Sequence, residues 1–210
     1  MADKKLESGN QFVIDTRYDR YKEFFPLLTR DVVEDYSSRT TSHGASQYPI
    51  WHDPEQSIFL SDPKKYGADF EIDPYWDTIA EGIYTWTKRK LAQHKINVEI
   101  KPVISWYMDY RKGGWQSVHT HSKNCITQVI QLDEQTHSFK AEENKPIELD
   151  LKEAQWGSTY TILTGEEPIY GSFMNYPGRC ILMSGDVFHG VYPVKSVPRR
   201  CIVIDYIILT

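Results

Sequence analysis

The chain of 210 residues lacks the features of secreted, membrane-spanning and strongly basic proteins. Its three cysteines, Cys125, Cys180 and Cys201, include no Cys-x-x-Cys spacing, which argues against a disulfide framework, a zinc ribbon or a redox motif. No apolar run approaches the roughly 18 residues of a transmembrane helix, and the polar start of the chain does not resemble a signal peptide. The net charge of −5 disfavours nucleic acid and anionic membranes as partners. We therefore expect a cytoplasmic protein with buried, reduced thiols.

Aromatic residues are plentiful, at 13% of the chain, and need a buried core. From residue 97 onward, short β-branched and aromatic runs alternate with Gly, Pro, Asp and Asn, which is typical of an all-β sandwich or barrel and not of a parallel α/β sheet. The predicted strands are 98–110, 125–132, 147–151, 159–163, 179–183, 187–191 and 200–209. We expect one compact domain, with an N-terminal extension of helix and loop, residues 1–96, packed on a β-core of residues 97–210.

One helix is indicated ahead of the strands. Asp73 suits the N-cap and Pro74 the first helical position. Ile79, Ile83 and Trp86 then recur at the spacing of one buried stripe, so the helix is expected to pack that face on the core.

Three of the seven histidines are candidate metal ligands. His119 and His121 form a His-x-His pair, and in an extended backbone residues i and i+2 project from the same face. His189 comes much later, on a strand predicted to begin just after a Gly-Asp turn. Two ligands from one strand and a third from a distant strand are how a β-barrel builds a three-ligand site with open coordination positions. Alone, a His-x-His pair is a weak signal, because most such pairs are surface or core histidines.

An arginine at the head of the last apolar strand is suited to bind a carboxylate, because a guanidinium group forms bidentate, charge-assisted hydrogen bonds. Alternation places Arg199, Cys201, Val203 and Asp205 on one face, which is small and polar as a ligand cavity requires. The opposite face begins with Arg200 and continues as apolar core. We favour Arg199 as the inward arginine, and the alternative is that both arginines are surface charges at the strand end.

The order of these elements, His-x-His, Gly-Asp-x-x-His and an arginine heading a final apolar strand, resembles the Fe(II)/2-oxoglutarate-dependent oxygenases. It is most similar to the prolyl-hydroxylase-like branch and its uncharacterised phage and bacterial relatives. The resemblance covers about residues 100–208, roughly half the chain. It implies a mainly β fold, the double-stranded β-helix or jelly-roll of the cupins. It also implies an enzyme that uses Fe(II), 2-oxoglutarate and O2 to hydroxylate a C–H bond and releases succinate and CO2. The substrate would be a small molecule or peptide, in the host cytoplasm if the protein is phage-encoded.

The resemblance places His119 and His189 on metal-ligand positions, but the usual second ligand, Asp or Glu, is His121 here. An imidazole in place of a carboxylate makes the site more positive by one charge. Three-histidine iron sites occur in cupin thiol dioxygenases, which favours His119, His121 and His189 as the ligand set. In the alternatives, His121 is a bystander and Asp109 or a water completes the site, or the site binds metal without turnover.

Cosubstrate residues also follow from the resemblance. Arg199 falls on the position that binds the far carboxylate of 2-oxoglutarate, with Arg200 one register away. Gln131 falls where prolyl hydroxylases often place a tyrosine that hydrogen-bonds the same carboxylate, and Thr127 shares its face by alternation.

Two other functions fit the pattern. A three-histidine cupin-type dioxygenase would need no 2-oxoglutarate, and the strand-end arginine and the Gly-Asp turn argue against it. A non-catalytic jelly-roll, such as a virion or sugar-binding module, is favoured by the missing carboxylate at position 121. The sequence indicates neither substrate nor oligomeric state, since an exposed strand edge would permit a homodimer without requiring one.

Overall fold

A computed structural model describes residues 3–29, 34–35, 42–52, 74–133, 156–195 and 198–209. The elements in chain order are β1 (Lys4–Ser8), β2 (Gln11–Arg17), the 3-10 helix η1 (Tyr21–Thr29), β3 (Glu34–Asp35), β4 (Ser42–His52), α1 (Pro74–Gln93), β5 (Glu99–His119), β6 (Cys125–Gln131), β7 (Thr159–Leu163), β8 (Ile169–Phe173), β9 (Arg179–Ser184), β10 (Phe188–Val191) and β11 (Arg199–Leu209). The predicted strand 147–151 lies outside the described residues. No helix in the described ranges is long and apolar enough to cross a membrane.

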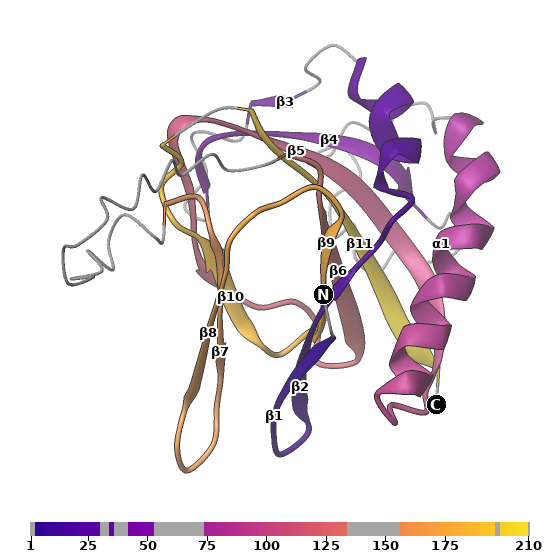
Figure 1. Ribbon diagram of the computed structural model, residues 1–210, viewed down its shortest axis with the longest axis vertical. Helices are drawn as coiled ribbons and strands as arrows, with labels where there is room; N and C mark the ends of the chain where they lie inside the picture. Colours follow the sequence, from indigo (N-terminus) through magenta and orange to yellow (C-terminus); the bar gives the residue numbers. More distant parts are fainter. Residues whose placement is uncertain are drawn as a thin grey trace, which may run out of the picture.

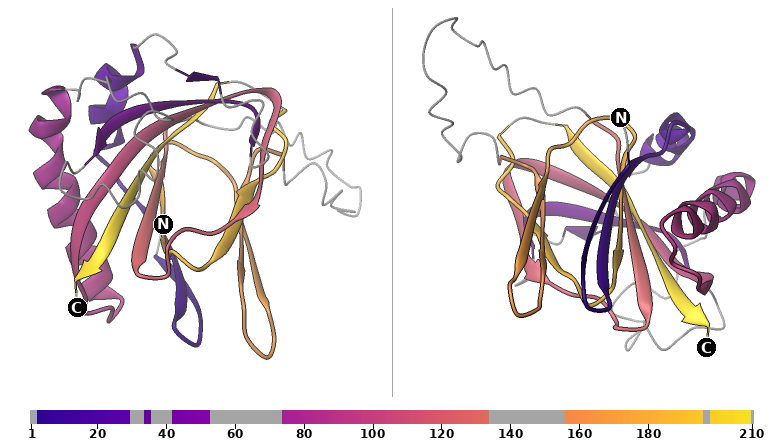
Figure 2. Two further views of the ribbon diagram at one scale, coloured as in Figure 1. Left: turned by 180° about the vertical axis from the view of Figure 1, so that it is seen from behind. Right: turned by 60° about the horizontal axis from the view of Figure 1, so that its bottom comes forward.

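The strands form one antiparallel sheet that curves into a nearly closed barrel (Figure 1). Its order is β1-β2-β9-β6-β11-β5-β10-β7-β8, and β4 pairs with both β3 and β5. Two further views show α1 on the outside of the curved sheet (Figure 2). This arrangement confirms the predicted jelly-roll, a double-stranded β-helix.

The last strand, β11, separates two cores, as its alternation predicted. Ile202 and Ile204 pack in the cluster that includes Ile83 of α1. Cys201 and Val203 pack in a second cluster, inside the barrel. Because every second residue of a strand faces the same way, this register also decides which arginine faces the interior.

Helix α1 begins at Pro74, as predicted, whereas the proposed N-cap, Asp73, lies outside the described residues. Ile79 and Ile83 are buried, and Trp86 is partly buried against the same core. The three cysteines are all buried with free thiols, as expected.

The N-terminal region contributes strands that the sequence analysis did not predict. In β2, every residue except Arg17 is buried, and β2 pairs with β9 in register. The strand contains a buried charge, Asp15. That carboxylate accepts a hydrogen bond of 2.8 Å from Arg179 Nε, so the ion pair compensates a residue that rarely occurs inside a sheet.

Two hairpins project from the same end of the sheet, β1–β2 and β7–β8 (Figure 1). The backbone N–H of Thr164 donates to Gln11 Oε1 at 2.6 Å, and Ser8 Oγ donates to the Thr164 carbonyl at 2.9 Å. These side-chain contacts join the two edges of the sheet where no strand ladder connects them in the described residues, which brings the barrel close to closure.

A buried polar network fixes α1 on the sheet. Tyr206 Oη donates to Gln128 Oε1 at 2.7 Å, and Thr87 Oγ1 lies 3.1 Å from the same oxygen. Gln128 Nε2 in turn donates to Cys180 Sγ at 3.4 Å. Since unpaired polar groups are costly in a core, these bonds specify how α1 sits.

We expect Tyr206→Phe to lower the free energy of unfolding by about 1 kcal/mol, because Gln128 Oε1 loses a buried hydrogen bond. Urea denaturation followed by circular dichroism measures the change. A free energy equal to that of the wild type would contradict a stabilising role for this network.

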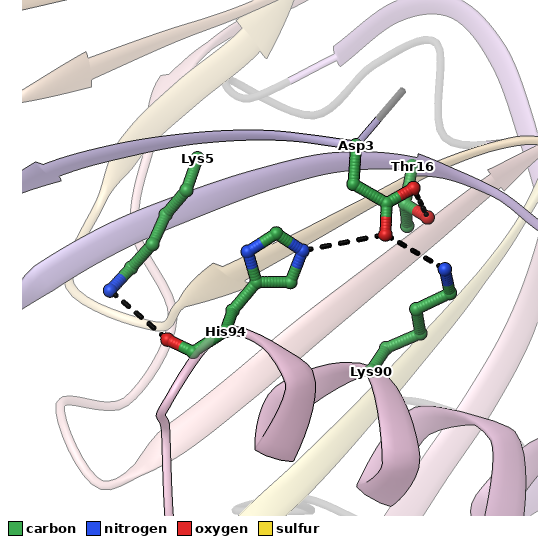
Figure 3. Close-up of polar contacts among 5 residues, drawn as sticks. All are labelled: Asp3, Lys5, Thr16, Lys90 and His94. Carbon is green, nitrogen blue, oxygen red and sulfur yellow. Dashed lines mark hydrogen bonds and ion pairs between the residues drawn. The ribbon is translucent and has the colours of Figure 1, made fainter. Parts of the chain in front are cut away.

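The start of the chain is tied to the end of α1 through one carboxylate (Figure 3). Asp3 Oδ2 lies 2.8 Å from Lys90 Nζ and 3.4 Å from His94 Nε2, and Thr16 Oγ1 donates to Asp3 Oδ1 at 2.7 Å. Lys5 Nζ adds a hydrogen bond of 3.3 Å to the His94 carbonyl. These contacts join β1 and β2 to the helix.

Asp3→Asn should lower the free energy of unfolding at pH 7 by about 0.5–1 kcal/mol, as for a small ion-pair network. Burial alone raises the pKa of Asp3, but hydrogen bonds from Lys90 and Thr16 outweigh it and hold that pKa below 3.8. A lowered folded-state pKa stabilises the protein above the unfolded pKa, and this is lost as the pH falls through the folded value. Urea denaturation at pH 7 and below pH 3.8 measures the stability that Asp3→Asn loses at each pH. The exposed Asp19→Asn is the matched control. Equal losses at both pH values would contradict the assignment.

Candidate metal centre

Three imidazoles converge inside the barrel. His119 ends β5 and pairs directly with His189 of β10, and His121 follows two residues after His119. One ligand nitrogen from each ring lies within 4.8 Å of the others. The ring centres of His119 and His189 are 4.3 Å apart, and that of His121 lies 5.1 Å from His189. The structure therefore brings together the three histidines that the sequence singled out.

The outer nitrogen of each ring is held by an acceptor. His119 Nδ1 lies 2.9 Å from the Ser117 carbonyl, and His189 Nδ1 lies 3.0 Å from the Val187 carbonyl. His121 Nδ1 lies 2.7 Å from a carboxylate oxygen, Oδ2 of Asp205. Carbonyls and carboxylates only accept, so each Nδ1 carries a proton, and Nε2 is the nitrogen that the neutral ring offers to a metal ion. This is the usual arrangement of metal-binding histidines, and the donor set fits a divalent transition metal ion.

Burial favours the neutral form that binds metal. It lowers the pKa of His189 well below 6.5, and repulsion from the other two rings acts in the same direction. Burial also lowers the pKa of His119. For His121, burial acts downward but the neighbouring Asp205 carboxylate outweighs it and raises the pKa. Two of the three ligands are thus neutral at physiological pH without any help from a bound cation.

The imidazoles face a cavity inside the barrel. Its walls are largely apolar or aromatic, with polar groups at each end. The lining residues are Trp106, Met108, Tyr110, Gln116, His119, His121, Val129, Thr159, His189, Val191, Arg199, Cys201 and Val203.

Arg199 is the charged group of this cavity, and it is only 1% exposed. Its Nη2 donates to Thr159 Oγ1 at 3.1 Å and its Nε to the Gly157 carbonyl at 3.2 Å. The guanidinium carbon lies 4.3 Å from the ring centre of Tyr110, a cation–π contact. Among the described residues, no carboxylate forms an ion pair with it. A buried guanidinium group with only neutral neighbours is a ready site for an anion.

The structure separates Arg200 from this cavity. Its guanidinium binds Asp133 on the opposite face of β11, with Nε 2.9 Å from Oδ2 and Nη2 2.6 Å from Oδ1. Asp109 lies on the same side as Arg200, where its carboxylate accepts a hydrogen bond of 3.2 Å from Tyr107 Oη. Asp109 is therefore not part of the histidine cluster, and His121 is.

The other two predicted cosubstrate residues lie at different ends of the site. Gln131 is buried, and its Nε2 donates to Thr159 Oγ1 at 3.2 Å, which places it next to Arg199. Thr127 Oγ1 instead donates to Asp205 Oδ1 at 2.7 Å, at the histidine end. Alternation gave these side chains the right face but not their position along the cavity.

Sequence analysis missed several side chains of the site. Asp205 was placed on the inward face but received no role. Trp106, whose ring stacks on His121 with centres 6.1 Å apart, and Tyr110 face the same cavity from β5. Thr159 reaches it from β7. The available signal was period-two alternation, which gives the face of a residue but not the partner that it meets.

No protein-family model and no curated protein sequence matches this chain. Among solved structures, it is similar to HygX from Streptomyces hygroscopicus with nickel and 2-oxoglutarate bound, with a TM-score of 0.57 and 11% identity over 93% of this chain and 82% of that one. OsALKBH1 gives a TM-score of 0.55 and 11% identity over 98% and 99% of the two chains. A Trichoplax adhaerens prolyl hydroxylase in complex with a hypoxia inducible factor peptide fragment gives 0.50 and 14% over 89% and 75%. The chain thus has the fold of the 2-oxoglutarate–Fe(II) oxygenases, as the resemblance implied.

Proposed function

We propose that this chain is an Fe(II)- and 2-oxoglutarate-dependent oxygenase of the cytoplasm that hydroxylates a C–H bond of a small molecule or peptide and releases succinate and CO2. One observation carries the proposal: a single cavity is lined by three imidazoles whose ligand nitrogens lie within 4.8 Å of one another and by a buried arginine with no carboxylate partner among the described residues. A metal site and an anion site that share one cavity fit a cosubstrate that reaches from one to the other. The fold shared with HygX, whose structure holds nickel and 2-oxoglutarate, adds support.

His119, His121 and His189 would hold the metal ion through their Nε2 atoms. When bound, Fe(II) supplies a Lewis-acidic, redox-active centre with coordination positions left open for the cosubstrate and O2. The Nδ1 hydrogen bonds hold the planes of the three rings and would thereby orient each ligating nitrogen toward the ion.

At the other end, Arg199 would bind the far carboxylate of 2-oxoglutarate. Thr159 holds the guanidinium group in place, and Tyr110 packs against its face, so little side-chain entropy is lost on binding. Gln131, which shares Thr159 as a hydrogen-bond partner, has a second amide N–H to donate toward the same carboxylate.

Between the two ends, the walls include Met108, Val129, Val191 and Val203. These apolar side chains exclude water from the space between the arginine and the imidazoles. Exclusion strengthens the electrostatic interactions of the site and protects reactive species from side reactions. In the balanced reaction, one oxygen atom of O2 enters succinate and the other enters the hydroxylated product.

An anaerobic titration tests the proposal. Fe(II) and 2-oxoglutarate are added to metal-free protein, and the visible charge-transfer band of the chelated cosubstrate is recorded, with succinate in place of 2-oxoglutarate as the control. We expect the band when Fe(II) is added with 2-oxoglutarate but not when it is added with succinate. We also expect the 2-oxoglutarate sample to form succinate after O2 is admitted. Absence of metal binding would overturn the proposal and leave a non-catalytic jelly-roll.

The three-histidine ligand set favours a second candidate, a cupin-type dioxygenase that needs no 2-oxoglutarate. In the same titration it predicts Fe(II) binding without the band. The buried Arg199 argues against this candidate, because a reaction without an anionic cosubstrate gives that side chain no partner.

A further inference from the structure

The three histidines of the cluster are not supported alike. His119 and His189 donate from Nδ1 to neutral backbone carbonyls. His121 donates to a carboxylate, Asp205, at 2.7 Å. His121 is therefore the histidine that contacts a negative charge. It also occupies the position where the oxygenases that this chain resembles carry a negatively charged ligand, Asp or Glu.

Asp205 is buried, and both of its carboxylate oxygens are engaged in hydrogen bonds. It is 5% exposed, and each of its oxygens has a partner: Oδ2 lies on His121 Nδ1, and Oδ1 accepts from Thr127 Oγ1 at 2.7 Å. Among the described residues, His121 is the ion-pair partner that the structure gives for this carboxylate. A buried carboxylate without an arginine or lysine is costly, which makes a nearby cation its natural complement.

A site with two histidines and one carboxylate ligand has the same net charge as this three-histidine site when Asp205 is included. Two neutral imidazoles and one carboxylate ligand carry a single negative charge. Three neutral imidazoles and one buried carboxylate behind them carry the same charge, moved outward by the width of one ring. Such a carboxylate fixes the ring tautomer and makes the ligating nitrogen more basic.

We propose that Asp205 is a positioning residue that supplies a negative charge to the metal centre through His121, because none of the three ligating histidines carries one. The proposal rests on the proposed function, because it assumes that the histidine cluster binds a divalent metal. It assigns the site a four-residue unit: His119, His189 and the coupled pair of His121 and Asp205. Thr127, which the resemblance placed near the cosubstrate, holds the second oxygen of the Asp205 carboxylate.

Titration of metal-free protein with Co(II), without 2-oxoglutarate, tests the proposal. Asp205→Asn keeps an oxygen that accepts from His121 Nδ1–H but removes the charge, and Asp205→Ala removes both. We expect Asp205→Asn to weaken Co(II) binding about 10–100-fold, and Asp205→Ala to weaken it at least as much. The ligand-field spectrum of bound Co(II) should stay that of the wild type in Asp205→Asn, because the three ligating nitrogens are unchanged.

Tyr206→Phe is the matched control, because it alters the neighbouring residue on the opposite face of β11 and leaves the metal cluster intact. It should bind Co(II) like the wild type. Metal-free Asp205→Asn should show a thermal unfolding midpoint no lower than that of the control, so that weaker binding is not a folding defect.

Two outcomes would overturn the proposal, and they are distinguishable. If the wild type binds Co(II) and Asp205→Asn binds it within twofold, Asp205 supplies no charge to the site, while the proposed function stands. If the wild type itself binds no divalent metal, the proposed function fails and this inference fails with it.

Discussion

Replacing His189 with alanine should abolish metal-dependent turnover and weaken Co(II) binding by more than about 100-fold, beyond the loss typical of a ligand's hydrogen-bonding partner. His189 is buried, pairs with His119 across the sheet, and holds its Nδ1 on the Val187 carbonyl. Its Nε2 is thus fixed toward the cluster, and no other described His, Cys, Asp or Glu belongs to that cluster besides His119 and His121. Calorimetric titration with Co(II) and succinate release measure the two effects.

His94→Ala is the control for this variant. His94 lies just after α1, where it contacts Asp3 far from the barrel interior (Figure 3). This variant should bind metal and form succinate like the wild type. Succinate production retained by His189→Ala would refute the assignment of His189 as a ligand.

Replacing Arg199 with methionine should raise the apparent KM for 2-oxoglutarate at least about 10–100-fold, the effect of losing hydrogen bonds to a charged group. Binding of Co(II) alone should not change, because Arg199 bonds to Thr159 and Gly157 and to none of the three histidines. The metal-free variant should also be more stable to urea, by about 1 kcal/mol, since an uncompensated buried charge is replaced by an apolar side chain.

Arg200→Met is the matched control one residue away. It breaks the paired hydrogen bonds to Asp133, so it should lose about 1 kcal/mol of stability and keep the KM of the wild type. The two neighbouring variants thus move stability in opposite directions, and only one moves KM. An unchanged KM in Arg199→Met would show that the cosubstrate does not use this arginine.

Much of the β-core could be predicted because β11 is buried on both faces yet differs in chemistry between them. One face of β11 carries Arg199, Cys201, Val203 and Asp205, and the other carries larger apolar residues. In the structure the apolar residues of the two faces pack in different clusters. The histidines were found by the same rule, because residues i and i+2 of an extended backbone project from the same face. Local periodicity therefore carried both predictions.

What the sequence could not give depends on partners distant along the chain. The burial of Asp15 in β2 depends on Arg179, which lies on another strand, β9. Asp205 had no role until His121 was placed beside it. The burial of a polar residue cannot be predicted from the neighbouring sequence, because it depends on a hydrogen-bond or ion-pair partner that is distant along the chain.

The pairing of β2 with β9 also sets an order for folding. Val13 lies opposite Met183, so a strand near the start of the chain completes its ladder only with residues made near the end. Until β9 has been synthesised, β2 lacks this neighbouring strand, and closure of so long a loop is slow. The architecture that places the histidine cluster inside a nearly closed barrel therefore ties completion of the sheet to residues from both ends of the described chain.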